Sequence, residues 1–255
     1  MFTLSNVSFS VDNKCLLHPV STSFRQGEVT GLIGHNGSGK STLLKLLARQ
    51  YQPSIGDITF DQRPLEQWKS RQFAQQVAYL PQHLPVSEGL TGLELIRFGR
   101  YPWQGLFGRE SADDQFQIER AIALTHTENL VHQAVDSLSG GERQRVWLAM
   151  LIAQQSRFLL LDEPLAALDI AHQVEVMALI QKLSHELGLG VVIVIHDINL
   201  AARYCDQLVA LHTGSILKHG QPNQIMQPEV LRSIYGIGMH IFPHPEFESP
   251  VAVVA

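Results

Sequence analysis

A glycine-rich stretch near the N-terminus of this 255-residue chain carries groups suited to binding phosphate. It lies between the apolar run Val29–Ile33 and a segment with helical spacing. Glycines let the backbone wrap tightly, so that successive N–H groups converge on phosphate oxygens at a helix N-terminus. We expect Lys40 to reach the β- and γ-phosphates of ATP and the Ser41 hydroxyl to ligate Mg²⁺. The predicted ATP-binding residues of this loop are Gly34, His35, Asn36, Gly37, Ser38, Gly39, Lys40, Ser41 and Thr42.

Two adjacent carboxylates end the apolar run Phe158–Leu161 and are followed by Pro164. Asp162 is placed to hold Mg²⁺, and Glu163 to polarise the attacking water as general base. Two solvated carboxylates at a strand end are the alternative interpretation. A phosphate loop in the same chain favours the catalytic one.

Two further polar residues follow other apolar runs. His196 comes directly after residues 191–195, and we expect it to hydrogen-bond the γ-phosphate and orient the water. A lone histidine in such a place is more often structural. Gln82 follows Val77–Pro81 and is expected to contact Mg²⁺ or the water, although a glutamine after a proline carries no signal by itself.

A second phosphate-binding string begins at Leu138, and its predicted contact residues are Ser139, Gly140, Gly141 and Glu142. A serine N-cap and two glycines before a predicted helix (142–153) leave free N–H groups at a positive dipole end. In isolation a plain N-cap explains the string equally well. Since the first loop already holds one face of a nucleotide, the economical arrangement is a head-to-tail homodimer in which each Ser139 loop caps the partner's ATP.

The elements that must position these groups follow from hydrophobic spacing. Residues 2–11 alternate as a half-buried strand, and 20–24 and 58–60 repeat the pattern, which indicates a small antiparallel sheet. The continuous apolar runs suit parallel strands covered on both faces, and they alternate with predicted helices (41–51, 170–187 and 199–205). Residues of about 88–155 read as a mainly helical insertion. The tail 243–255 has three prolines and no clear periodicity.

Composition limits the possible classes. The length suits one large domain over 1–255, and 45% hydrophobic with 17% charged residues is ordinary for a soluble globular protein. The net charge of −5 offers no global field for nucleic acid. No apolar stretch could span a bilayer, and no export signal is evident. Cys15 and Cys205 are too few for a disulfide framework, so we expect a cytoplasmic protein.

The motifs occur in one characteristic order: the phosphate loop, Gln82, Leu-Ser-Gly-Gly, Asp162–Glu163, Leu168–Asp169 and His196. Over nearly the whole chain this set resembles the ATP-binding cassette (ABC) ATPases. The resemblance implies a P-loop α/β core with an N-terminal antiparallel β-subdomain and an inserted helical subdomain. It also implies ATP and Mg²⁺ as cofactors, with Ser41, Gln82 and Asp162 at the metal, and a homodimer with Asp169 in the dimer loop. Transmembrane permease subunits would hold the chain at the cytoplasmic face of the inner membrane.

Several longer stretches resemble the branch of iron(III)-siderophore and vitamin B12 importers, in particular its ferric hydroxamate (ferrichrome-type) ATPases. They are residues 31–40, 99–103, 168–173 and 196–206, with Tyr235-Gly236-Ile237 and Pro243-His244-Pro245 near the C-terminus. The resemblance implies ATP-driven uptake of iron(III)-hydroxamates selected by a periplasmic or surface binding protein. The alternatives are another iron-chelate, haem or B12 importer, an exporter, or a non-transport ABC ATPase, which usually carries coiled coils or two cassettes.

The chain departs from the family pattern in two places. Val11 occupies the position of an aromatic residue that stacks on adenine in many members, which predicts aliphatic contact and loose base selectivity. Leu165 and Ala166–Ala167 replace the usual Thr-Ser, so a hydroxyl contact across the dimer is absent while the role of Asp169 remains. The aromatic residues Tyr101, Trp103 and Phe107 are interpreted either as satellite core or as an interface to a membrane subunit.

Overall fold

A computed structural model describes residues 1–12, 14–85, 87–104, 108–247 and 249–255. The N-terminal part forms an antiparallel sheet in the order β2-β1-β4-β5. Its strands are β1 (Phe2–Val11), β2 (Lys14–Phe24), β4 (Ile55–Phe60) and β5 (Arg63–Pro64). Phe2 of β1 lies opposite Phe24 on one side and Phe60 on the other, and all three rings are buried. This aromatic contact fixes the register of the sheet where it meets the rest of the core.

The central sheet has six strands in the order β10-β9-β3-β8-β7-β6. They are β3 (Val29–Ile33), β6 (Val77–Leu80), β7 (Phe158–Leu161), β8 (Gly190–Val194), β9 (Gln207–His212) and β10 (Ser215–Gly220). Five strands run parallel, and β10 pairs antiparallel with β9. The carboxyl ends of β3, β8, β7 and β6 therefore meet at one edge, where open α/β sheets bind ligands.

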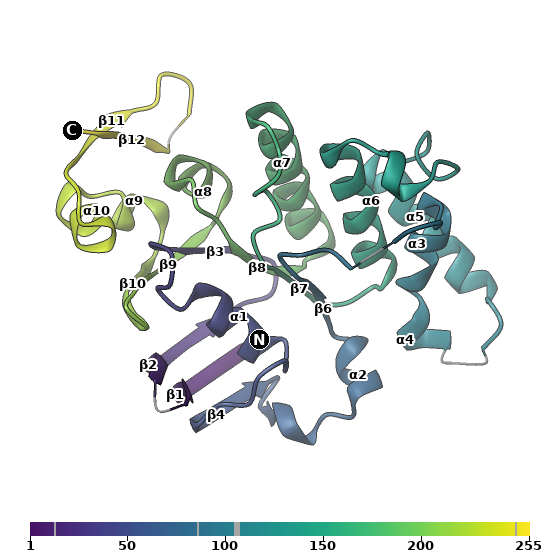
Figure 1. Ribbon diagram of the computed structural model, residues 1–255, viewed down its shortest axis with the longest axis horizontal. Helices are drawn as coiled ribbons and strands as arrows, with labels where there is room; N and C mark the ends of the chain where they lie inside the picture. The colour runs from purple at the N-terminus through teal and green to yellow at the C-terminus, as the bar shows by residue number, and fades with distance from the viewer. Residues whose placement is uncertain (13, 86, 105–107, 248) are drawn as a thin grey trace.

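Alternating side chains of the central sheet pack into two different cores. In Figure 1, α1 and the antiparallel sheet lie below the central sheet, and α6, α7 and α8 lie above it. On one face, Leu32 and Leu160 contact α1 (Lys40–Leu47) and the antiparallel sheet. On the other, Ile33 and Leu161 belong to a core shared with α6 (Gly140–Ala153), α7 (Ile170–Leu187) and α8 (Ile198–Tyr204). Burial on both faces explains why these strands read as continuous apolar runs.

The segment between β6 and β7 is mainly helical, as expected from the sequence. It contains α3 (Gly92–Phe98), α4 (Tyr101–Gln104), α5 (Ala112–Thr125), the 3₁₀ turn η2 (Val135–Ser137) and α6. The buried Arg100 joins these helices, because its guanidinium donates to Asp114 (2.7 Å), to Asp113 (3.1 Å) and to the Ala153 carbonyl (2.9 Å). Before β6 lie η1 (Leu65–Gln67) and α2 (Ser70–Ala74). The bounds of an insertion at about 88–155 within one domain remain a prediction.

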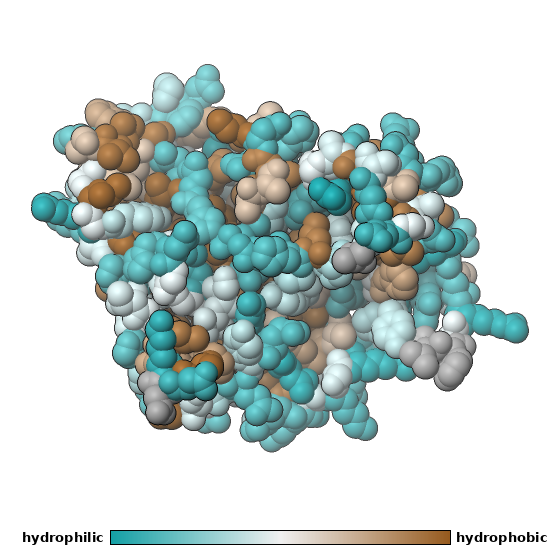
Figure 2. Space-filling model, in the orientation of Figure 1, coloured by the Kyte–Doolittle hydropathy of each residue, from teal (hydrophilic) through white to brown (hydrophobic). Residues whose placement is uncertain are grey.

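The C-terminal part comprises α9 (Pro222–Ile225), α10 (Pro228–Tyr235) and the hairpin of β11 (Met239–Pro243) and β12 (Pro250–Val254). The hairpin lies above α8 at the upper left of Figure 1. Its exposed hydrophobic residues include Phe242, Val253 and Val254, and Figure 2 shows hydrophobic surface in the same corner. The tail thus contains a strand that its prolines and lack of periodicity did not predict.

The expected fold class is confirmed, an α/β ATPase core with an antiparallel β-subdomain. The helix predicted over 41–51 is too long, because α1 ends at Leu47 and Arg49 takes a left-handed backbone (φ 57). The strand predicted over 20–24 is too short, since β2 begins at Lys14. Within the described residues, no helix combines the length and hydrophobicity needed to cross a membrane.

Candidate functional site

The phosphate loop connects the end of β3 to the start of α1, and two of its glycines are required by geometry. Gly34 has a φ of 139, and a Cβ there would lie 2.1 Å from the Leu211 carbonyl oxygen. Gly39 has a φ of 101 and forms the left-handed cap of α1. Only glycine adopts such conformations without strain. The loop is therefore closed tightly over the carboxyl edge of the sheet.

Lys40 lies inside this loop, with 4% of its surface exposed. Its ammonium donates to the carbonyl oxygens of Gly34 (2.8 Å) and His35 (3.0 Å). Burial lowers the pKa of Lys40, and the nearby carboxylates of Glu163 and Asp162 oppose that shift. The loop thus encloses a cation that faces two carboxylates, the charge pattern expected where phosphate and metal meet.

Ser41 and Asp162 are brought together from distant parts of the sequence. The Ser41 hydroxyl, in the first turn of α1, donates to Asp162 Oδ1 at 2.8 Å. Asp162 is 1% exposed, and burial raises its pKa while the hydrogen bond from Ser41 opposes the rise. A hydroxyl beside a carboxylate is the oxygen donor set that Mg²⁺ prefers. These two residues fit the metal role that the sequence assigns to them.

Glu163 lies between two side chains that sequence analysis assigned to the same site. Its Oε1 is 2.9 Å from His196 Nε2, after β8, and its Oε2 accepts from Gln82 Nε2 at 2.8 Å, after β6. Glu163 has a positive φ (51), which is uncommon for a residue other than glycine and is maintained only where the surroundings over-determine it. Gln82 thus contacts Glu163 directly, and Ser41 contacts Asp162.

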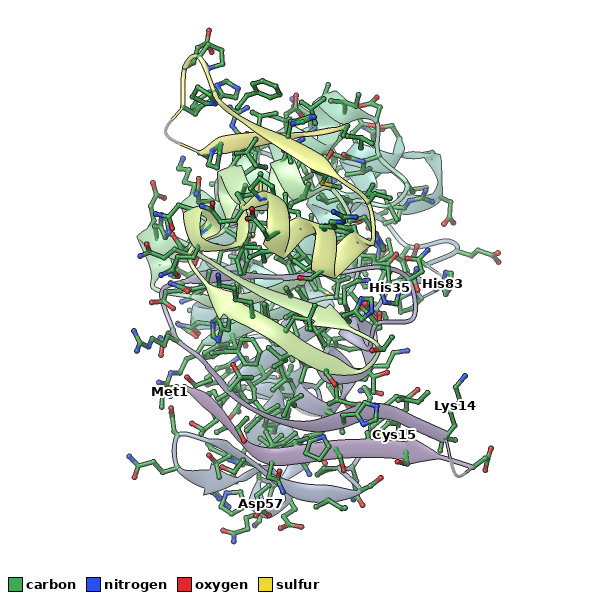
Figure 3. All side chains as sticks on the ribbon, turned by 90° about the vertical axis from the view of Figure 1, so that its left-hand side faces the viewer. Met1, Lys14, Cys15, His35, Asp57 and His83 are labelled. Carbon is green, nitrogen blue, oxygen red and sulfur yellow. The ribbon has the colours of Figure 1, made fainter. Side chains whose placement is uncertain are left out.

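The remaining predicted ATP-binding residues lie in the phosphate loop, in α1 and at the end of β1. Asn36 and Gly37 are exposed at the tip of the loop, and Thr42 is half-buried in α1. Val11 is the last residue of β1 and is 45% exposed. In Figure 3, His35 and His83, the neighbour of Gln82, lie on the same side of the molecule as Lys14 and Cys15 at the hairpin end. The β1–β2 hairpin, the phosphate loop and the Gln82 loop therefore share one side.

The second glycine string lies at the N-terminus of α6, where Gly140 lines a groove of about 440 Å³ together with Gln82 and Glu163. The Ser139 hydroxyl and Glu142 form a reciprocal capping box, in which Glu142 Oε2 accepts from the Ser139 N–H (2.9 Å) and hydroxyl (2.6 Å). A Cβ at Gly141 would lie 2.4 Å from the His172 ring, whereas one at Gly140 would make ordinary contact with Leu168 at 3.4 Å. Packing therefore requires glycine at 141 but not at 140.

Asp169 caps α7 and holds the same histidine ring. Its Oδ1 accepts from the His172 N–H at 3.0 Å and lies 2.8 Å from His172 Nδ1. Hydrogen bonds to His172 lower the pKa of Asp169, so the carboxylate stays charged. Through His172, the predicted dimer loop and the Ser139 string form one continuous surface.

A turn that packs under the phosphate loop was not predicted from the sequence. The turn between β9 and β10 packs there, with Gly214 N–H donating to the Ser38 carbonyl (3.0 Å) and His18 N–H donating to the Gly214 carbonyl (2.8 Å). The His35 and His212 rings pack edge to face, with centroids 4.7 Å apart. The dipeptide Thr213-Gly214 signals a turn, but nothing in the sequence links it to residue 38.

Fold and site together define a nucleotide-hydrolysing cassette with a P-loop core. A family model described as ABC transporter matches residues 17–166, and the chain belongs to this family as an ABC transporter ATPase. It is 41% identical over 246 residues to the petrobactin import ATP-binding protein of Bacillus anthracis, covering 96% of this chain and 90% of the relative. It is 36% identical to the iron(3+)-hydroxamate import ATP-binding protein of Bacillus subtilis, with coverages of 94% and 90%.

Solved structures agree with this assignment. An inward-facing ABC transporter of the metal-chelate type superposes with a TM-score of 0.87 at 25% identity, covering 100% of this chain and 96% of the other. A dimeric bacterial ABC transporter cassette gives a TM-score of 0.73 at 26% identity, with coverages of 87% and 98%.

Proposed function

We propose that this chain is the ATP-hydrolysing subunit of an importer of iron(III)-hydroxamate siderophores. The import role is supported by the similarity to ATP-binding proteins for siderophore uptake along nearly the whole chain. The choice of hydroxamate rests on the stretches quoted above, because relatives that import petrobactin and hemin show comparable identity. A periplasmic or surface binding protein would select the cargo. Another iron chelate, haem or vitamin B12 is the alternative cargo.

The observation that carries the catalytic proposal is Glu163 held between His196 and Gln82. Lys40 would bind the β- and γ-phosphates of ATP, and Ser41 and Asp162 would hold Mg²⁺, which supplies charge neutralisation at the phosphates. Glu163 would accept the proton of the attacking water, and His196 would orient that water and the γ-phosphate. Gln82 would report the state of the site to the helical segment.

The Ser139 string would act on a nucleotide bound by a second copy of the chain. No hydrogen bond among the described residues joins the string Ser139–Glu142 to Lys40, and Asp169 shares the surface of the string through His172. A head-to-tail homodimer brings both strings onto each ATP. The dimeric form of a similar cassette supports this arrangement.

A permease would bind beside α4. A groove of about 420 Å³ lies between α1, α2 and β6, and its lining includes Arg49, Phe73 and Tyr79. Arg71 and Gln75 donate to the Pro102 carbonyl, which fixes α4 at this place.

The aromatic residues of α4 differ in their exposure. The Trp103 indole donates to the Gln154 carbonyl at 2.7 Å, so this ring is partly structural, whereas Tyr101 is 52% exposed. Phe107 lies outside the described residues. A permease here would hold the chain at the cytoplasmic face of the membrane.

Uptake measurements test the cargo directly. A strain lacking this gene should fail to accumulate ⁵⁵Fe from a ferric hydroxamate and should recover with the wild-type gene but not with Glu163→Gln. Retained hydroxamate uptake with lost petrobactin, haem or B12 uptake would refute the cargo and preserve the import role. A defect in efflux alone would indicate an exporter, and unchanged transport of all substrates would favour a non-transport ATPase.

A further inference from the structure

One asparagine joins the C-terminal hairpin to the helix that follows His196. The Asn199 side chain is in the first turn of α8, and its amide makes two hydrogen bonds to one residue of β12. Asn199 Nδ2 donates to the Ala252 carbonyl (3.1 Å), and the Ala252 N–H donates to Asn199 Oδ1 (2.8 Å). The amide thus pairs with the outer edge of β12 as a neighbouring strand would.

A second contact fastens the same two elements. The Arg203 guanidinium, one turn further along α8, lies 3.9 Å from the centroid of the Phe247 ring in the loop between β11 and β12. His244 Nδ1 accepts hydrogen bonds from the N–H groups of Glu246 (3.0 Å) and Phe247 (3.2 Å), which fixes residues 244–247 of this loop. The contact is a cation–π interaction.

The hairpin depends on these contacts to stay in place. A two-stranded hairpin is marginally stable alone in water. Its inner side buries Ala252 against the main core, while Phe242 and Val253 on its outer side stay exposed. At the upper left of Figure 1 the hairpin lies beside α8 and α10, and β12 packs on α8 while β11 packs on α10. Through β12, the hairpin is therefore placed to hold α8.

The beginning of α8 is directly connected to the catalytic cluster. Asp197 caps the helix, with its Oδ1 accepting from the N–H of Asn199 (2.7 Å) and of Leu200 (3.0 Å). The preceding residue, His196, is 2.9 Å from Glu163. A continuous path of short contacts thus runs from Ala252 through Asn199 and Asp197 to the imidazole.

We propose that Asn199 is a positioning residue for hydrolysis, which uses the C-terminal hairpin to keep α8 and the His196 ring in place against Glu163. This inference rests on the proposed catalytic roles of Glu163 and His196. Asn199 acts through His196, and it leaves the phosphate loop untouched. Loss of its amide therefore slows turnover and spares nucleotide binding.

The test compares Asn199→Leu with a matched control on the same helix. Gln181 donates to the Tyr204 carbonyl at 3.2 Å and ties the opposite end of α8 to α7, so Gln181→Leu removes a comparable contact far from His196. We expect Asn199→Leu to lower kcat about fivefold with KM for MgATP unchanged within twofold, and Gln181→Leu to leave both unchanged. Equal effects of the two variants, or a rise in KM alone, would overturn the proposal. Melting temperatures of both proteins show that each remains folded.

A double-mutant cycle decides whether Asn199 acts through His196. Residual hydrolysis is measured under single-turnover conditions with excess enzyme for His196→Ala, Asn199→Leu and the double variant. We expect the double variant to hydrolyse ATP at the rate of His196→Ala, because the ring that Asn199 positions is already gone. A further fivefold loss would overturn the positioning role. Full activity of His196→Ala itself would instead refute the proposed catalytic cluster.

Discussion

The two glycine-rich strings of this chain both present a helix N-terminus, but they lie in different surroundings. The first, at α1, encloses Lys40 and is linked to carboxylates from β7 through the 2.8 Å contact between Ser41 and Asp162. The second, at α6, is closed on itself through Ser139 and Glu142. Its other close neighbour is the Asp169–His172 pair of α7.

This difference teaches that one chain carries two unlike halves of a nucleotide site. The first half has the buried cation, the oxygens that we propose bind Mg²⁺ and the proposed general base. The second half offers N–H donors and a dipole, yet among the described residues no hydrogen bond joins it to Lys40, Glu163 or His196. In a head-to-tail pair, each half meets its complement from the other chain.

The largest effect is expected from a substitution in the first half of the site, the phosphate loop at α1. Lys40→Ala removes the buried cation that faces the phosphates, so ATP affinity should fall about 100-fold or more, as for loss of a strong charge-assisted contact. Isothermal titration calorimetry measures the affinity of each protein for ATP. The fold should persist, because among the described residues the hydrogen bonds of Lys40 Nζ go to carbonyls of the loop and not to the core. Unchanged affinity would contradict the phosphate-loop assignment.

The second prediction concerns a substitution in the other half, the Ser139 string at α6, which leaves the phosphate loop unchanged. Ser139→Arg places bulk at the N-terminus of α6, so ATPase activity should fall about 100-fold while single-subunit ATP affinity stays within about threefold. Ser111→Arg is the matched control, since Ser111 caps α5 with the same reciprocal box, formed with Asp114. Similar activity losses in both variants would show that the Ser139 string is only a helix cap.

Substitutions at the neighbouring Gly140 and Gly141 distinguish an effect on packing from an effect on catalysis. Gly141→Ala should destabilise the protein by about 1–3 kcal/mol, because the new Cβ displaces the His172 ring. Gly140→Ala should leave stability unchanged or slightly higher, because a Cβ there meets only ordinary contact. Both should lower ATPase activity about tenfold. Thermal denaturation and initial rates measure the two effects, and full activity of Gly140→Ala would count against a partner nucleotide at this position.

The smallest effect concerns stability alone and lies far from both halves. Burial by itself would raise the pKa of Asp114, but hydrogen bonds from Ser111 and Arg100 outweigh it and lower the pKa to about 2. An aspartate with a lowered pKa stabilises the fold above its unfolded value near 4. This contribution, about 2 kcal/mol, is lost as the pH falls from about 4 to about 2.

Chemical denaturation of the wild type and of Asp114→Asn across this pH range measures the contribution. The variant should be less stable at pH 7 and should show a weaker loss of stability on acidification. If the two curves are parallel from pH 7 to pH 2, the Arg100–Asp114 contact does not carry this stability.

Much of the phosphate site could be predicted because its signals are local. Glycine conformations, a strand before and a helix after the loop, and a carboxylate at a strand end are written in consecutive residues. Parallel strands end at one edge of the sheet, and ligands bind there. This rule predicts that Ser41 lies near Asp162 and that His196 lies near Glu163, as the structure shows.

Other features depend on long-range packing that no short pattern encodes. Two long-range contacts are examples: the Gly214 turn lies beneath Ser38, and Asn199 pairs with Ala252. The positive φ of Glu163 likewise has no signal in the neighbouring sequence. The strand β12 escaped prediction because its short apolar run follows prolines and is stabilised by Asn199. The end of α1 at Leu47 reflects the left-handed turn at Arg49, a residue with no helix-breaking signal.

The most direct test of the two-halves account is the mass of Glu163→Gln measured by light scattering. The amide cannot accept the proton of the attacking water, so uncleaved ATP should join the Lys40 half of one chain to the Ser139 half of another. We predict a dimer with MgATP, a monomer with ADP or without nucleotide, and a monomer with MgATP when Ser139→Arg is added. A Glu163→Gln protein that stays monomeric at saturating MgATP, or a dimer that Ser139→Arg leaves intact, would contradict the account.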